Sequence, residues 1–290
     1  MSMAETSPVP LYPKLPLGTA IGLAYSTFFS RFTDVLGASW LWLVAVAALT
    51  GFANWQRWSW MTAVTGKTAL PDARQLWQTT VLLQLSAVLT ILAAVSIAVA
   101  WHRLMILNEQ PGLSASNITS GDLWRYVLVS IVLCAILIAP ALAVIIGGFY
   151  LTVPATFGPG AVAPAFIPLL IAAAALYVIG LVVMLRLSLL LPARAVGNTE
   201  LSFSQAWQRT SGNTWRLFWG LIVTVLPPLL LTDLIVVALM GLGHPTMTVT
   251  RMTAASTAIT VYYLLVLPIC IGFLSYAYRH FFERPLQQPA

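Results

Sequence analysis

Six long apolar runs constrain this chain more than any other feature of its sequence. A helix needs about 20 residues to cross the roughly 30 Å hydrocarbon core of a bilayer, and each run reaches that length. The runs are apolar on all faces, unlike amphipathic helices, and they are longer than barrel strands and do not alternate. We therefore predict six spans, near Leu36–Trp55, Thr80–Trp101, Arg125–Gly148, Ala163–Met184, Arg216–Leu242 and Ala254–Tyr278.

The composition agrees with a lipid environment. Of the 290 residues, 59% are apolar and only 8% are charged, whereas about a quarter of a soluble domain is charged. The net charge of +6 would suggest nucleic acid as a partner for a soluble protein. Since the basic residues lie mostly at the ends of the apolar runs, membrane topology and lipid headgroups explain them better, and we expect no nucleic-acid partner.

The distribution of lysine and arginine predicts the orientation. Four basic residues fall on one side of the predicted spans: Arg57, Lys67, Arg74 and Arg251. Ten fall on the other side: Lys14, Arg31, Arg103, Arg125, Arg186, Arg194, Arg209, Arg216, Arg279 and Arg284. Because cytoplasmic loops carry the excess of basic residues, we expect both termini in the cytoplasm.

Repeated signals at the cytoplasmic ends predict how the spans are grouped. Arg103 and Arg186 each close a run, and Trp-Arg pairs at 124–125 and 215–216 each open one. We predict an all-α polytopic membrane protein in which six spans form three consecutive helical hairpins, together with short interfacial helices. The hairpins cover about residues 17–110, 119–194 and 202–283 of one membrane domain at 17–284, flanked by a disordered tail at 1–16 and a short tail at 285–290.

The first short helix is predicted at Leu17–Phe32. Its apolar residues recur at helical spacing, but polar residues between them make the segment too polar to span. We expect an amphipathic helix lying at the membrane surface. The alternative is a cytoplasmic helix packed on the bundle.

A polar segment at residues 186–218 joins the fourth and fifth spans. It carries four of the basic residues: Arg186, Arg194, Arg209 and Arg216. Ser202 and Gln205 have the spacing of a capping box that opens a short helix. Gly212 lies in a Ser-Gly-Asn sequence that should end this helix, because glycine tolerates the left-handed conformation of such a stop.

Residues in this segment resemble a known family. The series is Pro192, Ala206, Trp207, Thr210, Gly212, Trp215 and Arg216. It is similar to that of a bacterial polytopic inner-membrane family that includes the YciC-type proteins and is related to the membrane domain of some glycerophosphodiester phosphodiesterases. The resemblance implies a topology and a bacterial inner-membrane location. It implies no reaction, because the phosphodiesterase domain is not part of this sequence.

Asp233 is the only acidic residue well inside an apolar run. It follows Pro227-Pro228, which should kink or break the fifth span and free backbone carbonyls. A broken helix beside a carboxylate is typical of transporters. The alternative is an interfacial carboxylate paired with Arg251 or Lys67.

No residue pattern predicts catalysis, so we expect a non-enzymatic protein with no metal and no cofactor. His102, His244 and His280 lie far apart, and zinc-protease, nucleophile-elbow and P-loop motifs are absent. The predicted role is envelope organisation, or binding of lipid or of a membrane-protein partner, self-association included. Anionic headgroups at the cytoplasmic face are the expected ligands, and a small transporter or channel using the fifth span is the alternative. Candidate functional residues are Asp233, Arg186, Arg194, Arg209, Trp215 and Arg216.

Overall fold

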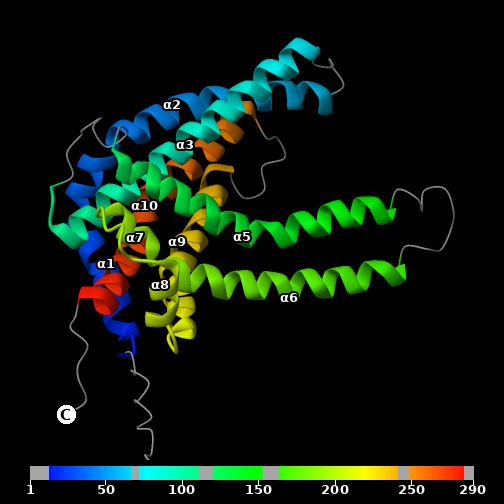
Figure 1. Cartoon of the computed structure of the whole chain (residues 1–290). Helices are drawn as coiled ribbons and strands as arrows, with labels where there is room; N and C mark the ends of the chain where they lie inside the picture. Colours follow the sequence, from blue (N-terminus) through cyan, green and yellow to red (C-terminus); the bar gives the residue numbers. More distant parts are fainter. Residues whose placement is uncertain (1–12, 67–71, 111–119, 153–162, 241–247, 284–290) are drawn as a thin grey trace, which may run out of the picture.

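The computed structural model describes residues 13–66, 72–110, 120–152, 163–240 and 248–283, and every regular element within these ranges is a helix (Figure 1). Six helices of this described part are long and apolar enough to cross a membrane. They are α2 (Phe32–Thr65), α3 (Ala73–Leu107), α5 (Gly121–Thr152), α6 (Ala163–Leu187), α9 (Thr214–Met240) and α10 (Val249–Tyr278). The predicted all-α fold class with six candidate spans is confirmed.

Consecutive long helices pack against each other as the predicted hairpins require. Helix α2 contacts α3, α5 contacts α6, and α9 contacts α10. Shorter elements connect or extend them: α1 (Leu17–Ser30), α7 (Leu190–Ala195), α8 (Phe203–Arg209) and the π-helical turn η2 (Arg279–Glu283). Residues 1–12 of the predicted tail at 1–16, and all of the predicted tail at 285–290, lie outside the described residues.

Several helices extend beyond the predicted spans. Helix α2 continues ten residues past Trp55, and α3 begins seven residues before Thr80. The extension of α3 starts at a capping box in which the Asp72 carboxylate accepts a hydrogen bond from the Gln75 backbone N–H at 2.6 Å. Hydropathy identifies the residues that suit lipid. A helix can continue into polar sequence, because its backbone hydrogen bonds do not depend on hydropathy.

Helix α10 lies at the centre of the molecule, with contacts to α1, α2, α3 and α9. Close packing against α9 depends on Gly220, because a Cβ built there would lie 1.9 Å from Cζ of Phe273. The Phe273 side chain is fully buried as a result. By contrast, the α5–α6 hairpin extends away from the other helices (Figure 1), and Ile145 and Ile171 on it are each 66% exposed.

Helix α1 packs against α9 and α10, which corresponds to the packed alternative for the predicted surface helix. Its Ala20 and Ala24 are fully buried. The Tyr25 hydroxyl donates a hydrogen bond to the Val223 carbonyl at 2.9 Å. That carbonyl is available because Pro227, four residues later, has no N–H to donate to it.

Residues that precede the predicted start of the domain also belong to the packed core. Leu15 is fully buried in a cluster with Leu217 and Phe281. Its backbone N–H donates to Asn213 Oδ1 at 2.9 Å. The packed part of the chain therefore includes residues assigned to the tail from sequence.

Candidate functional site

The polar segment between α6 and α9, which we call the arginine hinge (residues 186–216), has the local structure that its sequence predicts. Ser202 Oγ accepts from the Gln205 N–H at 3.2 Å, and Gln205 Oε1 accepts from the Ser202 N–H at 3.0 Å. The capping box at the start of α8 is thus confirmed. Gly212 has φ +72°, the left-handed conformation that ends this stretch.

Arg186 connects the end of α6 to α8. Its guanidinium lies 3.7 Å from the centre of the Trp207 ring, and its Nε donates to Thr210 Oγ1 at 3.3 Å. Its Nη2 donates to the Trp207 carbonyl. The side chain is therefore held by a cation–π contact and two hydrogen bonds.

The other hinge arginines donate to backbone carbonyls of neighbouring segments. Arg194 Nη2 donates to Leu201 O at 2.9 Å, within the hinge. Arg209 Nη1 donates to Phe281 O of η2 at 3.1 Å. Arg216 Nη1 donates to Leu15 O at 2.6 Å, so the hinge is bonded both to the N-terminal segment and to η2.

Carbonyl partners satisfy these guanidinium groups without neutralising them. Lys14 belongs to the same group, because its Nζ donates to the Gly212 carbonyl at 3.1 Å. Within the described part of the chain, none of five cations forms an ion pair with a carboxylate: Lys14, Arg186, Arg194, Arg209 and Arg216. The arginine hinge with Lys14 therefore carries five cations and one carboxylate, Glu200, and none of them forms an ion pair within the described part of the chain.

Exposed aromatic side chains accompany this charge. Trp215 is 67% exposed, and its ring stacks on Phe218 with 5.1 Å between the ring centres. Phe203 and Trp219 are also exposed. Indole rings favour the headgroup layer of a bilayer, which agrees with an interfacial position for the arginine hinge.

A second group of charges surrounds the C-terminal end of α3, and its arginines have carboxylate partners. We call it the paired end, and it contains Arg31, Asp34, Arg103, Glu109, Asp122, Arg125, Arg279 and Glu283. The shortest pairs are Arg31–Asp34 and Arg103–Glu109, each at 2.7 Å. Four arginines and four carboxylates leave this group neutral.

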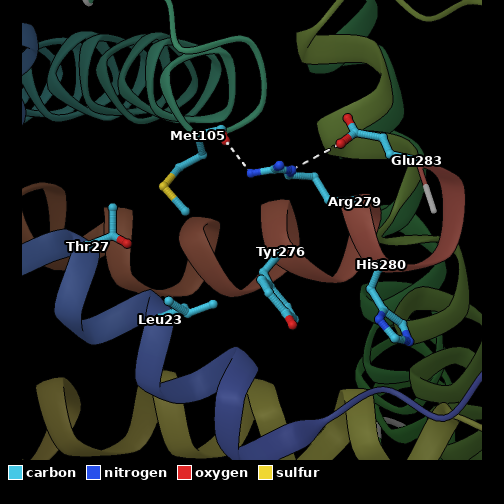
Figure 2. A pocket seen from close by; sticks show the side chains of 7 residues that line it. All are labelled: Leu23, Thr27, Met105, Tyr276, Arg279, His280 and Glu283. Atoms are coloured by element: carbon cyan, nitrogen blue, oxygen red, sulfur yellow. Dashed lines mark hydrogen bonds and ion pairs between the residues drawn. The ribbon is translucent and has the colours of Figure 1, made fainter.

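A cavity of about 360 Å³ lies beside the paired end. Leu23 and Thr27 of α1, Met105 of α3 and Tyr276 of α10 line it, together with three residues of η2: Arg279, His280 and Glu283. Figure 2 shows Arg279 extending toward Met105, with Glu283 on the other side of the guanidinium. Arg279 Nη1 donates to the Met105 carbonyl at 3.5 Å, and Nε donates to Glu283 Oε2 at 3.0 Å.

The residues of the alternative transport hypothesis lie elsewhere. Asp233 is exposed on α9 and forms no ion pair with Arg251, and Lys67 lies outside the described residues. The expected break at Pro227-Pro228 does not occur, because α9 continues as a helix through both prolines. The Val223 carbonyl that Pro227 frees accepts from Tyr25, and the Tyr262 hydroxyl donates to the Pro228 carbonyl at 3.0 Å.

Sequence reasoning gave no role to His102, which is fully buried on α3. His102 Nδ1 and Ser275 Oγ form a hydrogen bond at 2.7 Å, and Ser275 Oγ lies 2.9 Å from the Ile271 carbonyl oxygen. Nε2 has no hydrogen-bond partner in the described part of the chain. No group of three potential metal ligands forms among the described residues, and His244 lies outside them.

The cavity was also missed. Arg279 counted only toward the orientation, and Leu23, Met105 and Tyr276 carry no motif. The repeated arginine-ended runs were the available signal, since they bring the ends of α3 and α10 to the same face.

The three comparisons with known proteins gave no match: no family model, no curated protein and no solved structure corresponds to the chain. The resemblance of residues 186–218 to the YciC-type family therefore stays a prediction.

Proposed function

We propose that this chain is a non-enzymatic multi-pass membrane protein that binds anionic lipid headgroups through the arginine hinge. One observation carries the proposal: five cations gather there with carbonyl rather than carboxylate partners. The proposed setting is the bacterial inner membrane, with both termini in the cytoplasm and a role in envelope organisation.

The charge balance of the arginine hinge supports this proposal. Glu200 is its one acidic residue, and it forms no ion pair within the described chain. A lysine or arginine near an anionic leaflet contributes about 1 kcal/mol of attraction. Exposed tryptophans hold the same segment at headgroup depth.

The geometry of α9 gives less support to the transport alternative. Asp233 is exposed on a continuous helix, and neighbouring hydroxyls bond to carbonyls beside the prolines. A transporter of the kind considered would instead direct an acidic side chain and free carbonyls toward an internal path.

Retained lipid provides the test. The purified protein is equilibrated with mixed vesicles of phosphatidylcholine and phosphatidylglycerol, and the bound lipid is identified by mass spectrometry. The variant Lys14→Gln with Arg216→Gln removes two exposed cations, while each glutamine can still donate a hydrogen bond. At about 1 kcal/mol per charge, we expect the preference for phosphatidylglycerol to fall roughly 30-fold.

The matched control removes two charges of the paired end as one neutral pair, with Arg31→Gln and Asp34→Asn. These changes should alter the preference less than about twofold, because they leave the net charge unchanged. The proposal is wrong if both variants, each monodisperse and helical, retain phosphatidylglycerol equally. Reporter fusions at residues 1 and 290 test the orientation separately.

A further inference from the structure

The cavity of Figure 2 lies where lipid headgroups would be. The apolar parts of α3 and α10 both end beside it, at Arg103 and Arg279. Charged residues at the ends of spans occupy the headgroup layer. Its volume of about 360 Å³ is within the range of small-molecule sites, which are about 300–1,000 Å³.

The rim of this cavity carries one charge of each sign. The side chains of Arg279 and Glu283 are 54% and 40% exposed, respectively, and they are one helical turn apart. Exposed pairs of this kind contribute little to stability, so exchanging the partners costs little. Arg279 Nη2 has no partner within the described part of the chain.

A hydroxyl group adds hydrogen-bonding capacity. Thr27 lines the cavity, and its Oγ1 makes no hydrogen bond within the described part of the chain. Leu23 and the Met105 side chain supply apolar wall. The cavity thus offers a cation, an anion, the Thr27 hydroxyl, the His280 side chain and an apolar surface.

We propose that this cavity binds a phosphate ester that carries a primary ammonium group, the headgroup chemistry of phosphatidylethanolamine. Arg279 bonds the phosphate, and Glu283 accepts hydrogen bonds from the ammonium. The Thr27 hydroxyl donates to another phosphate oxygen, while Leu23 and Met105 contact the carbons next to the ester. The ligand's two charges replace the Arg279–Glu283 pair, so the site stays neutral when it is occupied.

The carboxylate determines this choice of ligand. An anionic headgroup at Arg279 would bring its negative charge close to Glu283 without a compensating cation. A choline headgroup has no N–H, so it cannot donate to Glu283. This site is distinct from the anionic-lipid surface at the arginine hinge, and it requires a different lipid.

The experiment measures which phospholipid the full-length protein retains. The protein in detergent is exposed to vesicles of equal parts phosphatidylethanolamine, phosphatidylcholine and phosphatidylglycerol, and the bound lipids are counted by native mass spectrometry. We expect phosphatidylethanolamine to exceed phosphatidylcholine at least tenfold. Glu283→Gln should abolish that preference, since it removes the charge-assisted hydrogen bond to the ammonium, and Arg279→Gln should lower the retention of phosphatidylethanolamine, since it removes the bond to the phosphate.

Two control variants match these changes. Glu109→Gln and Arg125→Gln remove similarly exposed members of other ion pairs of the paired end, away from the cavity, and should leave the preference intact. Thr27→Val keeps the side-chain volume and should lower retention about threefold without affecting the fold. Equal retention of phosphatidylethanolamine by Glu283→Gln, or equal retention of phosphatidylcholine by the unmodified protein, would overturn the proposal.

Two further experiments distinguish a soluble ligand from a phospholipid, and the cavity from the arginine hinge. Displacement of retained lipid by millimolar O-phosphoethanolamine would identify a soluble ester as a ligand of this cavity, and no displacement would identify the phospholipid. Lys14→Gln with Arg216→Gln should lower phosphatidylglycerol retention and leave phosphatidylethanolamine unchanged. Loss of both lipids in that variant would overturn the assignment of two separate sites.

Discussion

The arginine hinge and the paired end lie on the same face of the molecule and use the same residue type in different ways. At the paired end, Arg103 and Arg125 have carboxylate partners, and Asp122 contacts both. At the hinge, Arg186 and Arg209 bond to carbonyls and aromatic faces. One group is therefore neutral and the other is positive, although each contains several arginines.

The difference shows that counting cations predicts sidedness but not surface charge. All of these arginines contributed equally to the predicted orientation. Their electrostatic effect depends on their partners, because a carbonyl satisfies the N–H groups of a guanidinium and leaves its charge. Arginines of both regions also join segments that are far apart in the sequence: Arg209 bonds to Phe281 O, and Arg279 bonds to Met105 O.

Replacing Arg186 with alanine should have the largest effect on stability. It removes the Trp207 contact and the hydrogen bonds that join α6 to α8. We expect a loss of roughly 3 kcal/mol, because hydrogen bonds to charged groups contribute about 1.5–3 kcal/mol each and side-chain exposure reduces the sum. Thermal unfolding in detergent measures it. Arg186→Lys should recover less than half of the lost unfolding free energy, because lysine cannot stack on the Trp207 ring and donate to two acceptors at once. Full recovery would show that the positive charge alone stabilises this contact.

The second prediction concerns Asn213, which is fully buried and anchors the N-terminal segment to the hinge. Asn213→Ala leaves the Leu15 N–H without its acceptor, at a cost of about 2 kcal/mol. Hydrogen exchange should increase over α1 more than over α3. Asn108→Gly is the control beside the paired end. Asn108 has a φ of 55°, a conformation that glycine adopts freely, so this change should not strain the backbone. If both variants increase hydrogen exchange over α1 equally, the buried Asn213 contact does not stabilise the fold more than the exposed residues at the paired end do.

The smallest effect is expected at the paired end. Arg125 is 54% exposed and pairs with Asp122 at 3.1 Å. Arg125→Ala should lower the unfolding free energy by less than about 1 kcal/mol, and the loss should shrink further in 1 M salt. A loss as large as that of Arg186→Ala, measured by the same unfolding experiment, would contradict the comparison.

Much of the fold could be predicted from the sequence because lipid imposes length and composition on spanning helices. The six runs, the hairpin pairs, the Ser202–Gln205 capping box and the Gly212 turn all depend on local rules. The helix ends were less accurate. Polar segments such as 56–65 continue a helix without satisfying the hydropathy criterion.

The candidate site was predicted less completely, because its contacts join residues far apart in sequence. Arg216 was predicted as a lipid contact, yet its partner is the carbonyl of Leu15. The packing of α1 depends on a carbonyl made available by Pro227. Neither a local motif nor a hydropathy profile identifies a hydrogen-bond partner that is far away in the sequence. The cavity between α1, α3 and η2 could not be predicted for the same reason.

The contacts of the N-terminal segment have a consequence for biosynthesis. Lys14, Leu15 and Tyr25 bond to Gly212, Asn213 and Val223, almost 200 residues later in the chain. At ribosomal rates of about 5–20 residues per second, roughly 10–40 seconds separate the synthesis of these partners. Helix α1 therefore cannot complete its packing until α9 has been synthesised, and its docking marks a late stage of assembly.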